Sequence, residues 1–369
     1  MEQYSIIGRI GEGAHGVVLK AKHIESGELV ALKKVPLRKL ADGIPNTALR
    51  EIKALQFIES SPYVVHLREV FPHGTGFVLV FEYMVTDLSE VIRNSEPPLT
   101  EEQSKCYMLM ILRGVEVMHA NGIMHRDLKP ANLLISAEGV LKIADFGLAR
   151  VFENNNERLY SHQVATRWYR APELLYGAKK YTNSVDLWYI NYNLFGFRAI
   201  GCIFGELLNS SPLFPGENDI EQLWFVVRVL GTPNEDIWPE VKELPDYNKI
   251  SFNLCETIPF EEVLPDASVE AVALVSKFLV YPPHQRITVS EALKDPYFTT
   301  DPLPAQLSEL PVVTPHPNTL PHPQETYEVC LTTPLESILR NHELLKEGVK
   351  LLDDELRNSL DDSTGVTRM

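Results

Sequence analysis

Acidic, amide and lysine side chains gather in two short motifs near the middle of the chain. HRDLKPAN at residues 125–132 supplies Asp127, Lys129 and Asn132, and DFG at 145–147 begins with Asp145. A third motif, APE, follows at 171–173. Each motif is short, but all three in this order make coincidence a weak explanation. Such groups suit phosphoryl transfer, which needs neutralised charge and aligned oxygens more than covalent help.

A glycine-rich motif, GEGAHGVV, occupies residues 11–18. Glycines allow a tight hairpin to bring backbone N–H groups onto phosphate oxygens, where a Cβ would intrude. A glycine-rich turn of purely structural use is at least as common, so this motif alone is weak evidence. Because it lies between two predicted strands rather than between a strand and a helix, it does not fit a dinucleotide-binding fingerprint.

Lys33 lies in an otherwise apolar predicted strand, and Glu51 lies on the helix predicted after it. An isolated lysine in a half-buried strand usually extends its ammonium group to solvent. A carboxylate on a movable helix could instead hold the lysine against two phosphates.

The elements that must position these residues change in character along the chain. Hydrophobic alternation predicts strands over the first 35 residues and at 64–71 and 77–83. Helical spacing of apolar residues predicts one helix between them, at 45–58. The first 85 or so residues are therefore expected to form a sheet with one helix.

The second part of the chain is predicted to be mostly helical. Thr100 and Gln103 resemble a helix cap that opens a long apolar-periodic run to His119. Further helices are predicted at 199–208, 220–230 and 268–280. The expected fold class is therefore α+β.

With these motifs in this order, residues 4–298 resemble a eukaryotic protein kinase. The resemblance implies a bilobal fold, with a small β-rich N-lobe at 4–84 and a larger, mainly helical C-lobe at 85–298. It also implies ATP as the phosphate donor and magnesium as the metal.

The resemblance also implies roles for individual residues. Asp145 would hold one magnesium ion and Asn132 the second, and Asp127 would accept the proton of the attacking hydroxyl group. Lys129 would steady the transferred phosphoryl group, and Thr166 would complete the arrangement beside Asp127. Lysine two residues after Asp127 is similar to serine/threonine kinases.

The expected nucleotide site combines both lobes. Phe81 resembles the gatekeeper residue, and the backbone of Glu82 and Met84 would meet the adenine edge. The full set implied by the resemblance is Ile10, Gly11, Glu12, Gly13, Ala14, His15, Gly16, Val17, Val18, Ala31, Lys33, Glu51, Phe81, Glu82, Met84, Asp87 and Leu134.

The segment YSHQVATRWYR at 160–170 resembles the cyclin-dependent kinases of the CMGC group, with Ser161 as the site of an activating phosphate. A serine in a surface loop is usually only solvated. Here Arg50, Arg126 and Arg150 match the phosphate-binding cluster of that family, and a phosphate carries enough charge to order a loop between arginines. WYRAPE implies Ser-Pro or Thr-Pro substrates, and Ser161 implies an upstream activating kinase.

A cyclin or cyclin-like activator is the expected partner, although PNTALREIKAL at 45–55 departs from the family's PSTAIRE sequence and leaves the partner's identity open. Ala14 and His15 replace the Thr-Tyr pair that receives inhibitory phosphate, so that route should be absent. Resemblance to one vertebrate member implies roles in cell-cycle progression, activation of other cyclin-dependent kinases, and ciliary hedgehog signalling. The implied locations are nucleus and cytoplasm, with the cilium as a further candidate.

Composition excludes several other classes. The 34 Lys and Arg against 50 Asp and Glu give a net charge of −16, which disfavours nucleic-acid or acidic-membrane binding through overall charge. No apolar run approaches a membrane span, and the start lacks a signal-peptide pattern. The four widely spaced cysteines suggest neither a zinc site nor a disulfide framework.

The C-terminal part has two predicted segments. Seven prolines between residues 302 and 323 predict a Pro-rich linker at 299–332. Apolar residues recurring from Ile338 to Leu360 predict an amphipathic helix in an acidic tail at 333–369. Docking on its own domain or fraying in solvent is favoured over a dedicated partner site.

An unusual insert, YINYNLFGFR at 189–198, separates SVDLW from AIGCI, which the family joins in one buried helix. Ten extra helical residues would rotate the later part by about 280° beyond whole turns and lengthen the helix by about 15 Å. The insert must then bulge out or break the helix. An error in exon joining is favoured over an adaptive loop. Because Asp186 anchors the catalytic loop in kinases, the alternative function is an inactive kinase-fold scaffold or binding module.

Overall fold

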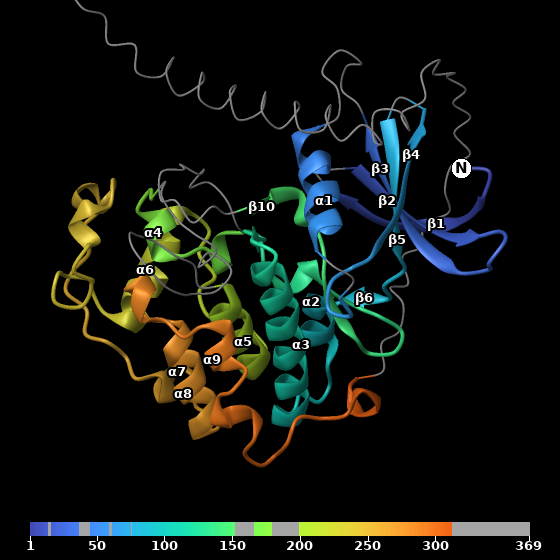
Figure 1. Ribbon diagram of the computed structural model, residues 1–369. Helices are drawn as coiled ribbons and strands as arrows, with labels where there is room; N and C mark the ends of the chain where they lie inside the picture. Colours follow the sequence, from blue (N-terminus) through green and yellow to red (C-terminus); the bar gives the residue numbers. More distant parts are fainter. Residues whose placement is uncertain are drawn as a thin grey trace, which may run out of the picture.

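The computed structural model describes residues 1–13, 16–36, 45–58, 61–74, 76–151, 166–178 and 199–311. Ala14, His15, Ser161, Asp186, the insert at 189–198 and the tail at 333–369 lie outside the described residues. In Figure 1 the five-stranded sheet and α1 lie at the upper right, and the other labelled helices lie below them and to the left.

The N-lobe contains a five-stranded antiparallel sheet in the order β1-β2-β3-β5-β4. Its apolar residues alternate between two faces, because successive side chains of a strand point to opposite sides. One face packs on helix α1, which confirms the prediction of a sheet with one helix. The elements are β1 (Tyr4–Gly13), β2 (Gly16–His23), β3 (Leu29–Pro36), α1 (Asn46–Phe57), β4 (Leu67–His73) and β5 (Gly76–Glu82).

Strand β4 begins three residues later than the sequence predicts. Residues 64–66 were expected to be part of it, but their backbone turns to the C-lobe: Val65 N donates to Ile143 O at 2.9 Å, and Val64 forms an isolated bridge with Ile143. Ile143 N in turn donates to Tyr63 O at 2.9 Å. These bonds join the start of β4 to the C-lobe, which the apolar pattern alone does not reveal.

The C-lobe is built around α3 (Glu101–Ala120), as predicted, and Figure 1 shows this helix running through the middle of the lobe. Its start has the expected cap, with Gln103 N donating to Thr100 Oγ1 at 3.4 Å and Thr100 N donating to Gln103 Oε1 at 3.1 Å. The other helices are α2 (Leu88–Asn94), α4 (Pro172–Leu175), α5 (Ala199–Asn209), α6 (Asp219–Leu230), α7 (Phe260–Val263), α8 (Val269–Phe278) and α9 (Val289–Ala292).

Short strands of the C-lobe carry the residues below the nucleotide pocket. One sheet has the order β6-β8-β9 and a second pairs β10 with β7. The strands are β6 (Thr86–Asp87), β7 (Ile123–Met124), β8 (Leu133–Ile135), β9 (Leu141–Ile143) and β10 (Arg150–Val151).

No helix of the described residues is both long and apolar enough to cross a lipid bilayer.

The start of the Pro-rich segment is not a free linker, contrary to the sequence prediction. Its described part, 299–311, packs on the start of α3. The ammonium group of Lys105, which is 1% exposed, donates to Thr300 O at 3.0 Å and to Pro302 O at 2.7 Å. Ala305 N donates to Glu102 O at 2.9 Å. A buried lysine needs such partners, so this segment belongs to the folded lobe.

Candidate active site

A cavity of about 600 Å³ lies between the lobes, and the glycine-rich hairpin contributes Gly11, Gly16 and Val18 to its lining. Gly16 is required in that hairpin, because it has φ +130° and an added Cβ would lie 1.9 Å from Lys34 O. The lining residues that the sequence predicted are Ile10, Gly11, Gly16, Val18, Ala31, Lys33, Glu51, Phe81, Glu82, Met84, Asp87, Asn132, Leu134 and Asp145.

One described residue of the predicted nucleotide site, Val17, differs from the lining set. Val17 packs with the N-lobe core instead, because it alternates with Val18 along β2 and points to the opposite face. Glu12 and Gly13 belong to the backbone of β1. Ala14 and His15 are not described.

Six further residues line the cavity that the sequence motifs do not predict. They are Val65, Tyr83, Val85, Thr86, Ala131 and Ala144. Ala131 and Ala144 stand beside Asn132 and Asp145, and Tyr83 and Val85 flank Met84, so adjacency to known motifs could have indicated them. Val65 reaches the cavity through the long-range contact with Ile143, for which the sequence has no local signal.

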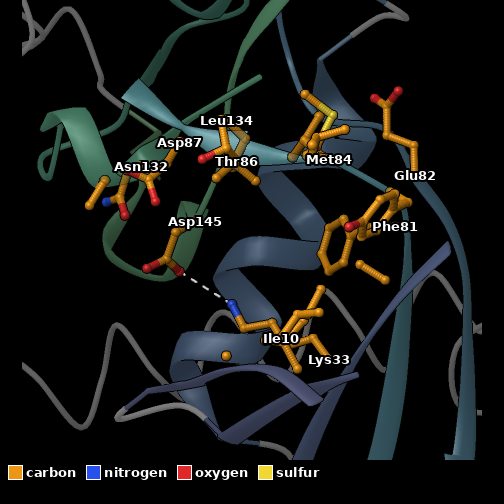
Figure 2. Close-up of a pocket in the computed structure, with 18 of the residues that line it drawn as sticks. Ile10, Lys33, Phe81, Glu82, Met84, Thr86, Asp87, Asn132, Leu134 and Asp145 are labelled. Carbon is orange, nitrogen blue, oxygen red and sulfur yellow. Dashed lines mark hydrogen bonds and ion pairs between the residues drawn. The ribbon is translucent and has the colours of Figure 1, made fainter. Parts of the chain in front are cut away.

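Lys33 extends from β3 into the cavity and contacts two carboxylates. Its Nζ lies 2.8 and 2.7 Å from the two oxygens of Glu51 on α1. It also lies 3.3 Å from Asp145 Oδ1, the contact that Figure 2 marks with a dashed line. Burial alone would lower the pKa of Lys33, but the charges of Glu51 and Asp145 outweigh it, so the pKa is raised. The lysine is therefore a permanent cation that points to where phosphates would lie.

Asp145 adopts a left-handed backbone conformation, with φ 62° and ψ 67°, directly before the buried Phe146. Aspartate tolerates this region better than most residues but still with some strain. The buried ring of His125 packs edge-on against Phe146, with centroids 4.9 Å apart. This contact fixes Asp145 in the cavity and ties the DFG motif to the HRD motif.

His125 organises the backbone of the catalytic motif. Its Nδ1 accepts a hydrogen bond from Asp127 N at 3.2 Å, and its Nε2 lies 2.9 Å from Ala144 O. Because the carbonyl oxygen of Ala144 can only accept, Nε2 carries the proton and the ring is neutral. The ring thus sets the direction of the chain at Asp127.

Asp127 is held by donors on both carboxylate oxygens. Oδ1 accepts from the backbone N and the hydroxyl group of Thr166, both at 2.9 Å. Oδ2 accepts from Lys129 Nζ at 2.9 Å and from Asn132 Nδ2 at 3.2 Å. Lys129 Nζ also donates to Thr166 Oγ1 at 2.9 Å. The structure therefore brings four of the five predicted catalytic side chains into one network, and the fifth, Asp145, lies in the adjoining cavity.

Asn132 and Asp145 could hold a divalent cation together. The amide nitrogen of Asn132 donates to Asp127 O and Oδ2, which leaves the amide oxygen as the atom suited to a metal. In the described part of the chain, no group of three or more His, Cys, Asp or Glu could bind a metal by itself. A cation here would take its remaining oxygen ligands from phosphates and water.

Arg50 and Arg126, two of the three predicted phosphate-binding arginines, lie near each other, and the third, Arg150, belongs to β10, which contacts α1. Burial lowers the pKa of Arg50 on α1, and the nearby positive charge of Arg126 lowers it further. Arg126 Nε donates to Leu148 O at 2.8 Å, and Arg150 in β10 pairs with Met124 of β7. An anion between these groups would relieve their mutual repulsion. Ser161, its predicted source, lies outside the described residues.

The segment after Thr166 is fastened to the helices of the C-lobe. Tyr169 donates to Glu206 of α5 at 2.7 Å, and Trp168 Nε1 donates to Gly216 O at 3.2 Å. Asp219 at the start of α6 accepts from Arg167 Nε at 2.9 Å and Arg170 Nη1 at 3.0 Å.

Glu173, just after this segment, forms a buried ion pair with Arg286. Arg286 Nη1 lies 3.2 Å from Glu173 Oε1, and both side chains are 0% exposed. Glu206, Asp219 and Arg286 are not predicted from the sequence, since no local pattern marks a partner that lies 37 or more residues away.

These features define a protein kinase, and the chain belongs to that family: the protein kinase domain matches residues 4–298. It is a member of the cyclin-dependent kinases and a serine/threonine protein kinase. The predicted family, bilobal fold and enzyme class are thereby confirmed. Use of ATP and a divalent metal follows from the family.

The relatives within the family are similar over most of their length. Cyclin-dependent kinase 20 of Danio rerio is 70% identical over 312 residues, which cover 85% of this chain and 88% of that protein. Cyclin-dependent kinase 20 of Homo sapiens is 61% identical over 350 residues, or 94% and 98% of the two chains. Among solved structures, the yeast RNA Pol II CTD kinase CTDK-1 complex gives a TM-score of 0.73 at 34% identity, covering 85% of this chain and 96% of that chain.

Proposed function

We propose that this chain is a magnesium-dependent, proline-directed serine/threonine kinase that a cyclin or cyclin-like protein activates. The observation that carries the proposal is the network around Asp127, whose two oxygens are held by Thr166, Lys129 and Asn132. A carboxylate held at both oxygens keeps one orientation toward an incoming hydroxyl group, as proton acceptance and alignment of the nucleophile require.

In the proposed mechanism, ATP lies in the cavity with its adenine against the backbone of Glu82 and Met84. Lys33 contacts the phosphates, and Asp127 orients the substrate hydroxyl group and accepts its proton. Lys129 steadies the transferred phosphoryl group, since it lies 2.9 Å from Asp127 Oδ2 and shares Thr166 with it. Magnesium at Asn132 and Asp145 would neutralise phosphate charge.

Preference for Ser-Pro and Thr-Pro sites rests on the resemblance of WYRAPE to proline-directed kinases, and the position of the segment 166–170 supports presentation of a substrate there. The segment begins with Thr166 bonded to Asp127 and continues through residues fastened to α5 and α6. A substrate chain lying along it would therefore present its acceptor to Asp127. The arginines at 50, 126 and 150 support activation by phosphate on Ser161, added by an upstream kinase.

The wider role rests on similarity. Relatives named cyclin-dependent kinase 20 span nearly the whole chain, which supports roles in cell-cycle progression, activation of other cyclin-dependent kinases and ciliary hedgehog signalling. We propose the nucleus and cytoplasm, with the cilium as a further location. The second candidate function, an inactive scaffold, is motivated by the insert at 189–198, directly before α5.

One experiment separates these functions. The full chain, with a candidate cyclin, is given labelled ATP, magnesium and either a Ser-Pro peptide or the same peptide with Ser-Ala. We expect transfer to the Ser-Pro peptide, and loss of turnover in Asp127→Asn with nucleotide binding largely retained. A parent chain that binds ATP without transferring phosphate would support the scaffold, and equal turnover in Asp127→Asn would refute the role of Asp127.

A further inference from the structure

An ion pair joins the end of β5 in the N-lobe to β9 in the C-lobe. Lys142 Nζ donates to both carboxylate oxygens of Glu82, at 2.8 and 2.7 Å, and the backbone N of His66 donates to Oε1 at 2.8 Å. The side chains of Lys142 and Glu82 are only 16% and 20% exposed. Neither side chain has a part in the phosphoryl-transfer chemistry described above.

Lys142 belongs to the layer that forms the floor of the nucleotide cavity. Asp87 of β6 pairs with Leu134 of β8, and Leu134 pairs with Lys142 of β9. Paired residues of antiparallel strands project from the same face of a sheet, so these three side chains form one row. Asp87 and Leu134 line the cavity, and Lys142 continues their row to Glu82.

The backbone that carries Lys142 is fixed on two sides. Its strand pairs with β8, and the adjacent residue Ile143 exchanges hydrogen bonds of 2.9 Å with Tyr63 and Val65 of the N-lobe. The backbone from which Lys142 extends is therefore held in one place relative to the N-lobe, so only the lysine side chain has to be ordered to reach Glu82.

Glu82 lies at the end of β5, where the backbone forms the rim of the cavity. Figure 2 shows its carboxylate turned outward, away from Lys33 and Asp145. Its backbone N also donates to His66 O at 3.3 Å. Bonds to the side chain and to the backbone N together restrict rotation of this residue, and so restrict the direction of its carbonyl group.

We propose that Lys142 is a positioning residue for nucleotide recognition, which acts by holding Glu82 so that its carbonyl oxygen faces the 6-amino group of adenine. The inference rests on the proposed function, in which the backbone of Glu82 meets the adenine edge. Lys142 touches neither the nucleotide nor the reacting atoms, so it influences affinity for ATP rather than the rate of phosphate transfer.

A purine without the 6-amino group distinguishes positioning from general bracing. ATP donates a hydrogen bond from that group, whereas purine riboside triphosphate cannot. If Lys142 sets the direction of the carbonyl group, Lys142→Met should weaken ATP binding about three- to tenfold and purine riboside triphosphate binding less than twofold. If the substitution only made the N-lobe less rigid, it would weaken binding of both nucleotides to the same extent.

Binding of both nucleotides, with magnesium, is measured by calorimetry on the full chain, together with KM for ATP and kcat. Methionine keeps the apolar stem of lysine. The matched control is Lys277→Met, which breaks a 2.6 Å ion pair with Asp295 on the C-lobe away from the cavity. We expect the control to bind both nucleotides as the parent does.

Glu82→Gln and the double variant with Lys142→Met complete a double-mutant cycle. The double variant should bind ATP no more weakly than the weaker-binding single variant. If Lys142→Met binds ATP as tightly as the parent, or loses affinity equally for the two nucleotides, the inference is refuted while the proposed function stands. A parent chain that does not bind ATP would instead refute the proposed function and the inference with it.

Discussion

Replacing Thr166 by valine tests whether the network around Asp127 is catalytic. Valine keeps the shape of threonine and removes two hydrogen bonds of 2.9 Å, from Oγ1 to Asp127 Oδ1 and from Lys129 Nζ to Oγ1. The backbone N of residue 166 still donates to Asp127, which limits the loss.

The expected size follows from these contacts. A hydrogen bond to a charged group contributes about 1.5–3 kcal/mol. Loss of one such contribution in the transition state would lower kcat by about 10- to 100-fold. KM for ATP should change little, because Thr166 does not line the nucleotide cavity. The assay is steady-state phosphorylation of a Ser-Pro peptide, with thermal melting to verify folding.

Thr166→Ser is the control, since serine keeps the hydroxyl group and loses only a methyl group. We expect its kcat to remain within about threefold of the parent, well short of the loss of a charged hydrogen bond. Parental kcat in Thr166→Val would refute the reasoning. So would equal impairment of the serine and valine variants, because the hydroxyl group would then not be the cause.

Four further outcomes can be checked separately. Ser161→Ala should lower activity after treatment with an activating kinase, and unchanged activity would contradict the phosphate switch at Arg50, Arg126 and Arg150. Burial raises the pKa of Glu206 above its ordinary 4.5, so protonation favours the folded state and stability falls as pH rises through the folded pKa. The melting temperature of Glu206→Gln minus that of the parent should therefore increase as pH rises above 4.5. A difference that stays the same at every pH would refute this. Lys105→Met leaves Thr300 O and Pro302 O without their donor, which should lower the free energy of unfolding by about 1–3 kcal/mol in denaturant titration. Deleting 189–198 should raise the free energy of unfolding by about 1–3 kcal/mol, and with it the melting temperature and the turnover. A deletion variant that melts lower or loses activity would show the insert to be a working part.

Local patterns predicted the elements and motifs of this fold well. The alternating strands, the helix at 46–57 and the cap at Thr100 each depend on residues a few positions apart. The Lys33–Glu51 contact was also foreseen, and its 2.7 Å distance agrees with the hypothesis of a lysine held by a helix carboxylate.

Contacts between distant segments could not be foreseen in the same way. Glu173 and Arg286 are 113 residues apart, and either side chain alone could have been a solvated surface charge. The start of β4 was placed too early because an apolar run does not say whether its backbone bonds to β5 or to Ile143. The prolines after residue 299 predict a linker, yet the start of this segment is fixed by Lys105, nearly 200 residues earlier.

The charges lining the active site have a consequence for the form in which ATP enters. Two cations, Lys33 and Lys129, stand among three carboxylates, Glu51, Asp127 and Asp145, so this inner set carries a net charge of −1. A free triphosphate would meet repulsion from Asp145 and competition from Glu51 for Lys33. Bound to a divalent cation, the same nucleotide arrives with its charge reduced and turns the Asp145 carboxylate from a repulsive group into a ligand. We therefore expect the metal–nucleotide complex, rather than ATP alone, to be the form that this cavity selects.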